Sequence, residues 1–155
     1  MERKTKVNAE EGKRDLIIMR EFDLPVALLF MAYEKPEIVE QWMGTKALKY
    51  DAQKHGSYQF QTKGPNGDVV FSANGTFHDV VPNERIVRTF EMENAGFGVQ
   101  IEFLEFEALT ENSSRLVTHV VYKSGELRDA NLKLPFAWGI NMAHDRLEEI
   151  VGKLR

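Results

Sequence analysis

The stretch from Lys46 to Tyr122 constrains the fold most, because it holds six strand-like runs and no segment of useful length with helical periodicity. Loops of hairpin length, rich in Gly, Pro, Asn and Asp, separate the runs. Strands joined this closely must be mostly antiparallel, since a parallel pair needs a crossover of about a dozen residues or more. The predicted strands are Ala47 to Ala52, Ser57 to Thr62, Val69 to Val80, Arg85 to Met92, Val99 to Ala108 and Arg115 to Tyr122.

Helices are expected on both sides of this β region. A further strand, Asp15 to Phe22, comes first, and Pro25 and Pro36 begin two short helices after it. After a loop containing Gly125, apolar residues recur every three or four positions, which predicts a long amphipathic helix. Its stripe comprises Phe136, Ile140, Ala143, Leu147, Ile150, Val151 and Leu154. The order β-α-α-β6-α predicts an α+β domain with a seven-stranded sheet packed against the last helix.

Composition limits the classes of function. A chain of 155 residues, 43% hydrophobic, fits one domain, which we place at 14–155 after a loosely attached polar tail at 1–13. A net charge of −4 disfavours a nucleic-acid partner, and we expect none; the lack of cysteine excludes disulfides and thiolate catalysis. No apolar stretch is long enough for a signal peptide or a bilayer span, so we expect a cytoplasmic protein with no membrane partner.

Several motifs occur in an order and spacing typical of a known family. They are REFDLP from Arg20 to Pro25, QWMG ending the second helix, HGSY from His55 to Tyr58, GTFHDVVPNERIVRTF from Gly75 to Phe90, and Trp138. With these motifs the chain resembles the activator of heat-shock protein 90 ATPase homologue family of the START-like (SRPBCC) superfamily, which includes polyketide cyclase-related and stress-response proteins. The resemblance covers about Arg14 to Leu154. It implies a helix-grip fold, in which a curved antiparallel sheet surrounds a long C-terminal helix.

A pocket is expected between the sheet and this helix, because a sheet curled around a helix leaves a gap that side chains fill only in part. The resemblance implies that the pocket takes a small hydrophobic molecule. Plain core packing is the alternative for each large side chain. The candidate ligand-binding residues are Trp42, Met43, Phe71, Phe90, Phe103, His119, Phe136 and Ile140.

Catalytic, metal and cofactor sites have little support in the sequence. The four histidines are scattered without metal-ligand spacing, and we expect no metal and no cofactor. His119 shares a strand face with Val117 and Val121, and could point into the pocket. Glu102 and the other carboxylates near it are expected on the solvated face of the sheet. Arg20 could point inward, where it would need a partner, or along the rim of the sheet.

Three functions remain open at this point. The leading hypothesis is a non-catalytic domain that binds a small hydrophobic ligand. The family resemblance also implies a co-chaperone that stimulates the heat-shock protein 90 ATPase, and a cyclase or hydrolase using the same pocket is the third. A homodimer is conceivable because Trp138 lies off the apolar stripe. We expect the segment from Ser124 to Leu134, rather than a partner chain, to cover Trp138.

Overall fold

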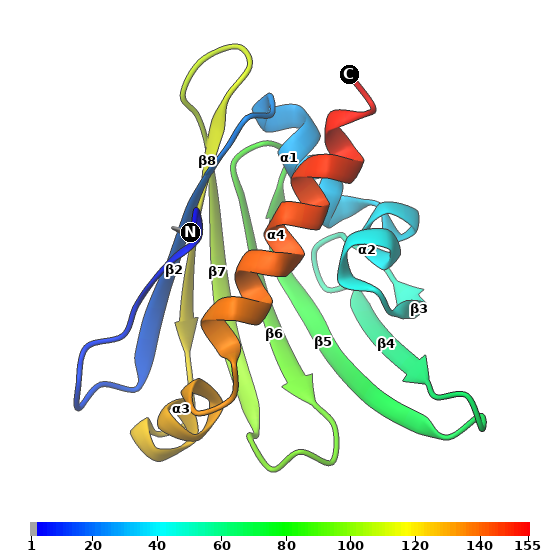
Figure 1. Ribbon diagram of the computed structural model, residues 1–155, viewed down its shortest axis with the longest axis vertical. Coiled ribbons are helices and arrows are strands. Elements are labelled where there is room, and N and C mark those ends of the chain that lie inside the picture. The colour runs from blue at the N-terminus through cyan, green and yellow to red at the C-terminus, as the bar shows by residue number, and fades with distance from the viewer. Residues whose placement is uncertain (1–2) are drawn as a thin grey trace.

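An eight-stranded antiparallel sheet curves around one side of the molecule in the computed structural model, which describes residues 3–155 (Figure 1). A long helix crosses the open side of the curve. The elements, in chain order, are β1 (Lys6–Asn8), β2 (Asp15–Phe22), α1 (Val26–Glu34), α2 (Pro36–Met43), β3 (Lys46–Tyr50), β4 (Ser57–Lys63), β5 (Val69–Val81), β6 (Arg85–Met92), β7 (Val99–Ala108), β8 (Ser114–Val121), α3 (Gly125–Leu132) and α4 (Phe136–Gly152).

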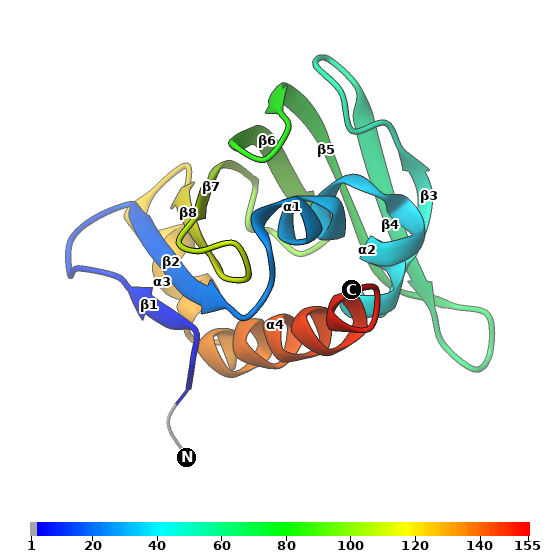
Figure 2. The same cartoon turned by 90° about the horizontal axis from the view of Figure 1, so that it is seen from above.

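The strand order is β1-β2-β8-β7-β6-β5-β4-β3, and each neighbouring pair is antiparallel. Strands β3 to β8 follow one another as hairpins, whereas β2 joins the sheet beside β8 from the other end of the chain. Seen from above, the sheet forms an arc with α1 and α2 on its concave side and α4 across its opening (Figure 2). The predicted α+β helix-grip fold is therefore confirmed.

The strand count differs from the prediction, because the sequence analysis expected seven strands and the sheet has eight. The additional strand β1 pairs with β2, with Lys6 opposite Met19. The backbone N–H of Thr5 donates to Asn141 Oδ1 on α4 at 3.1 Å, and the Thr5 side chain is buried. The expected loose attachment is therefore wrong for this part of the polar N-terminal segment. Three residues of alternating exposure carry too weak a pattern to be recognised in the sequence.

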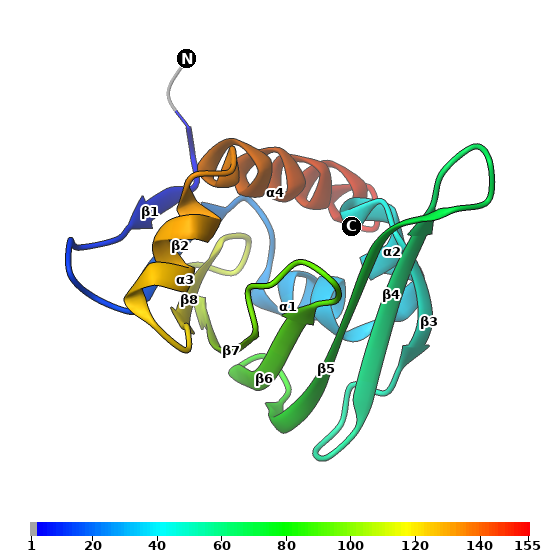
Figure 3. The same ribbon diagram turned by 90° about the horizontal axis from the view of Figure 1, so that it is seen from below.

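Helix α3 is a second element that was expected to be a loop. The Ser124 hydroxyl accepts a hydrogen bond from the backbone N–H of Leu127 at 3.2 Å and caps its first turn. Helix α3 lies at the opposite end of the molecule from α1 (Figure 1), beside the start of α4 and near the loop between β6 and β7 (Figure 3). The side chain of Leu127 lies 3.8 Å from the position a Cβ would take at Gly98 in that loop.

Two local features set the shape of the concave face. Gly44 ends α2 in the left-handed conformation at φ 69°, which turns the chain directly into β3. Gly75 in β5 lets the ring of Tyr58 lie against the strand, since a Cβ there would come within 2.4 Å of the Tyr58 ring and 2.1 Å of the Thr89 carbonyl oxygen. The Tyr58 hydroxyl donates to the same Thr89 carbonyl oxygen.

The hydrophobic core consists of two clusters, which contact different halves of α4. Its C-terminal half buries Leu147 and Val151 completely, in a cluster with the two short helices and the middle of the sheet. Its N-terminal half carries Phe136 and Ile140, which are only partly buried and lie against a smaller cluster around Leu16 and Val120. The helix therefore packs tightly at one end and leaves space at the other.

Candidate functional site

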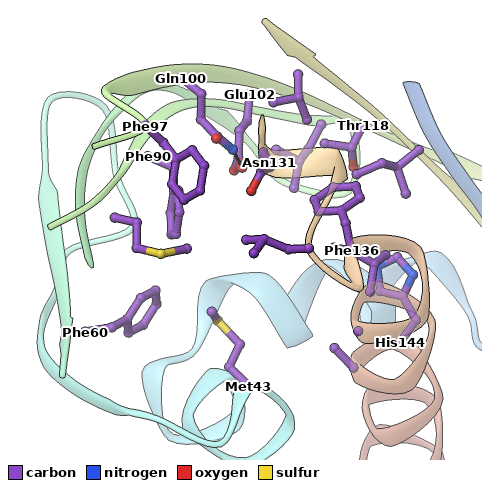
Figure 4. Close-up of a pocket in the computed structure, with 18 of the residues that line it drawn as sticks. Met43, Phe60, Phe90, Phe97, Gln100, Glu102, Thr118, Asn131, Phe136 and His144 are labelled. Carbon is purple, nitrogen blue, oxygen red and sulfur yellow. Dashed lines mark hydrogen bonds between the residues drawn. The ribbon is translucent and has the colours of Figure 1, made fainter. Parts of the chain in front are cut away.

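A cavity of about 510 Å³ lies between the concave face of the sheet and the N-terminal half of α4 (Figure 4). Strands β6 and β7 form one wall, and α2, α4 and the turn between α3 and α4 complete it. Its volume falls within the range of pockets that hold small organic molecules. Most of the lining is apolar, including Trp42, Met43, Phe60, Phe71, Phe90, Met92, Phe97, Leu104, Val120, Leu134, Phe136 and Ile140.

Six of the eight candidate ligand-binding residues line this cavity. They are Trp42, Met43, Phe71, Phe90, Phe136 and Ile140. Trp42 is held in place because its indole N–H donates to the Ala32 carbonyl oxygen at 2.7 Å. Phe136 and Ile140 face the cavity from successive turns of α4.

Phe103 and His119 lie outside the cavity, and their assignment to it was wrong. On β7 the even-numbered residues, such as Leu104 and Phe106, face the core, so Phe103 faces outward and is exposed. On β8, Thr118 and Val120 line the cavity, which places His119 on the convex face as well. The two side chains are cross-strand neighbours there, with ring centroids 5.9 Å apart.

His119 makes a hydrogen-bonded contact with Asp15 on the convex face. Its Nε2 lies 2.7 Å from Asp15 Oδ2, and both side chains are more than one-third exposed. The hydrogen bond to His119 lowers the pKa of the Asp15 carboxyl below its usual range. Because neither group reaches the cavity, this pair cannot act on a molecule held there.

The sequence analysis missed the polar part of the cavity wall. Arg88 on β6 and Glu102 on β7 are cross-strand neighbours, and both line the cavity. Arg88 Nε donates to Glu102 Oε1 at 2.8 Å, and each side chain is only 13% exposed. Gln100 Nε2 donates to the second oxygen, Glu102 Oε2, at 2.9 Å (Figure 4). The expectation that Glu102 lies on the solvated face is therefore wrong.

Strand alternation contained the signal for this pair. Arg88 shares its face of β6 with Phe90, so the inward placement of Phe90 already required an inward Arg88. On β7 the signal was ambiguous, because Val99, Ile101 and Phe103 make the outward face as apolar as the inward one. Without the structure, the hydrophobic pattern of β7 fits either orientation.

Aromatic rings surround the Arg88 guanidinium. Its central carbon lies 5.6 Å from the ring centroid of Tyr58 and 5.9 Å from that of Tyr33, at distances where cation–π attraction operates. Burial raises the pKa of Tyr33 and of Tyr58 above the usual range, so both remain uncharged phenols at neutral pH. Uncharged phenols therefore flank the guanidinium on this wall of the cavity.

His144 on α4 also faces the cavity, although its sequence position beside Ala143, at the edge of the apolar stripe, predicts exposure at the rim. It is buried because the N-terminal segment covers it: Nδ1 lies 2.8 Å from Thr5 Oγ1, and Nε2 lies 3.5 Å from the Tyr33 hydroxyl. Burial, together with the nearby charge of Arg20, lowers the pKa of His144 to about 3. At neutral pH the cavity therefore meets an uncharged imidazole.

Trp138 remains uncovered at 55% exposure, together with its neighbours Leu134 and Met142. The expectation that the segment from Ser124 to Leu134 covers it is therefore wrong. That segment forms α3 and the turn leading into α4, and it closes the cavity instead of covering the outer side of α4. Trp138 is thus an exposed aromatic on the outside of the helix that bounds the site.

Two further features are absent from the described part of the chain, a cluster of metal ligands and a membrane-spanning helix. Residues 3–155 contain no cluster of three or more His, Cys, Asp or Glu side chains suited to a metal ion. None of the helices in the same range combines the length and apolar character needed to span a bilayer.

Comparisons with known proteins agree with this architecture. The family model described as Activator of Hsp90 ATPase homolog 1-like protein matches residues 23–152. No protein with a curated description matches the chain. Among solved structures, a crystal structure from Mycobacterium smegmatis aligns with a TM-score of 0.82 at 18% identity, covering 94% of this chain and 95% of that one.

Two further solved structures are similar to the same extent. A crystal structure from Rhodobacter sphaeroides has a TM-score of 0.82 at 20% identity, covering 97% of this chain and 100% of that one. A solution structure from Arthrobacter aurescens has a TM-score of 0.84 at 17% identity, covering 96% and 91%. At these identities the similarity shows a shared fold.

Proposed function

Because the chain belongs to the Activator of Hsp90 ATPase homolog 1-like family, we propose that it is a START-like domain that binds a small hydrophobic molecule between its sheet and α4. The observation that carries the proposal is the cavity of about 510 Å³ with its mostly apolar wall. A core that served stability alone would be filled, because empty apolar space forfeits dispersion contacts. Binding a molecule there would restore those contacts.

Gly139 offers a direct test, because it lines the cavity from α4 and a Cβ built on it meets no atom within 4 Å. Gly139→Phe should place its ring in the cavity and abolish binding of the neutral dye Nile red, followed by the rise in its fluorescence. Gly139→Ala is the matched control. It should bind the dye and be more stable by about 0.5–1 kcal/mol, because alanine is the better helix former. Equal dye binding by both variants would contradict the proposal.

His119→Gln should leave the affinity for Nile red unchanged within about twofold, since His119 faces the convex side and its contact is with Asp15. The same titration measures it. Phe90→Ala gives the contrasting case, because Phe90 lines the cavity and its removal should weaken dye binding. A loss of affinity in His119→Gln equal to that in Phe90→Ala would mean that the dye binds on the convex face.

Stimulation of the heat-shock protein 90 ATPase is a second candidate, suggested by the family description together with an apolar surface on the convex face. Ile17, Met19, Ile101 and Phe103 are all exposed there, and such side chains suit contact with a protein. An ATPase assay of the chaperone with and without this protein tests it. A cyclase or hydrolase, the third candidate, would have to use groups inside the cavity, where Glu102 is the carboxylate among the described lining residues.

A further inference from the structure

We infer that the cavity selects an uncharged ligand with a hydroxyl group at one end, held by Arg88 and Glu102; this inference rests on the proposed binding function. The two side chains lie on the same wall and are linked through Arg88 Nε and Glu102 Oε1 at 2.8 Å. Their opposite charges cancel, so the wall presents donors and acceptors without net charge.

The ion pair is costly where it lies. Each side chain is only 13% exposed, and taking both charges out of water carries a desolvation penalty that their attraction often fails to recover. Similarly sized apolar residues would fill the same space at no such cost. The pair therefore needs a reason other than stability, and a hydrogen-bonding role toward a bound molecule provides one.

Hydrogen-bonding capacity remains on both members of the pair. The guanidinium has five N–H donors, of which Glu102 takes the one on Nε and the Tyr50 hydroxyl takes another. Each Glu102 oxygen accepts one hydrogen bond, from Arg88 or from Gln100, and a carboxylate oxygen can accept a second. A hydroxyl group is the simplest partner for such a wall, because it accepts from a guanidinium N–H and donates to a carboxylate at the same time.

Charged ligands fit this wall less well. A ligand carboxylate that approached Arg88 would also meet the negative charge of Glu102, only one hydrogen bond away. A ligand ammonium that approached Glu102 would meet Arg88 in the same way. Either ion would lose its hydration on entering the apolar cavity without gaining an unopposed counter-ion. The pair therefore excludes both signs of charge and admits the neutral hydroxyl.

Three pyrene derivatives of matched size test this selectivity by fluorescence titration at pH 7. They are 1-pyrenemethanol, which is neutral, 1-pyrenecarboxylate, which is anionic, and 1-pyrenemethylamine, which is cationic. The unmodified protein should bind the alcohol at least about tenfold more tightly than either ion, the size expected for hydrogen bonds to charged groups. If the protein binds none of the three, the proposed binding function fails and this inference with it.

Glu102→Gln should remove the discrimination against anions. With its counter-ion removed, Arg88 should bind 1-pyrenecarboxylate about tenfold more tightly than in the unmodified protein, while affinity for the alcohol changes by less than about threefold. Glu107→Gln is the matched control, because Glu107 lies on the same strand but pairs with Arg115 on the outer face. If Glu102→Gln does not fold, the double variant Arg88→Met with Glu102→Met provides a second test. It should bind 1-pyrenemethanol about tenfold more weakly than the unmodified protein, because the hydroxyl loses both hydrogen-bond partners, while both ions still bind weakly in the apolar cavity. Binding of the three probes with equal affinity before and after these substitutions would overturn the inference and leave the proposed binding function standing.

Discussion

Replacing Asp145 by Asn and Glu148 by Gln together should lower the free energy of unfolding by about 3–5 kcal/mol, the cost of leaving a buried charge without its partners. The charge in question is Arg20, whose side chain is fully buried where β2 faces α4. Its Nη1 lies 2.8 Å from Asp145 Oδ1, and its Nη2 lies 3.4 Å from Glu148 Oε1. Chemical denaturation followed by circular dichroism measures the change.

Two other variants test whether the loss of stability comes from the unpaired charge of Arg20. Glu149→Gln breaks the ion pair with Lys153 on the solvated side of the same helix, and should cost no more than about 0.5 kcal/mol. Arg20→Met removes the buried charge itself, and should cost clearly less than the double substitution. If Arg20→Met is as damaging as the double substitution, the packing of the side chain against Phe22 matters more than its charge.

Acid should destabilise the protein through His144. The unfolded chain protonates this histidine near the ordinary imidazole pKa of 6.5, whereas the pKa of His144 in the folded protein is about 3. Between these values the unfolded chain binds more protons, so stability rises with pH through this window and is lost as the pH falls. For this one group the loss from pH 7 to pH 4 amounts to about 3 kcal/mol.

The measurement is the free energy of unfolding at pH 4 and at pH 7, compared between the unmodified protein and His144→Gln. Glutamine cannot take up the proton, so the difference between the two pH values should shrink by about 3 kcal/mol in this variant. His78→Gln is the control, because His78 is exposed on β5. An identical pH response in His144→Gln and in the unmodified protein would show that His144 is protonated at no cost in the fold.

The order and type of the main elements could be predicted because each leaves a strong periodic pattern. Seven of the eight strands and three of the four helices were expected from alternation, proline placement and the apolar stripe of α4. Strand β1 and helix α3 were missed for a common reason. Lys6–Asn8 and Gly125–Leu132 are mostly polar, and they are held by contacts distant in sequence, such as the pairing of Lys6 with Met19 and the hydrogen bond from Arg128 to the Glu10 carbonyl oxygen.

The cavity could be predicted from the fold, whereas its chemistry could not be predicted in full. Residues on helices, such as Trp42 and Ile140, were placed correctly because the apolar face of an amphipathic helix is unambiguous. Strand residues were harder, because β7 is apolar on both faces and a one-residue error exchanges every side chain between them. That error placed Phe103 inside and Glu102 outside, and it concealed the ion pair with Arg88.

The pairing of β2 with β8 delays folding of the chain during its synthesis. A ribosome releases β2 early, but its partner β8 follows only after both short helices and five further strands, and α4 follows later still. Until then the concave face, with its aromatic side chains, lacks the cover that α4 provides. Contacts of such long sequence separation form slowly, and exposed apolar surface of this kind is prone to aggregation. The nascent chain should therefore depend on protection by cellular folding factors until α4 has emerged.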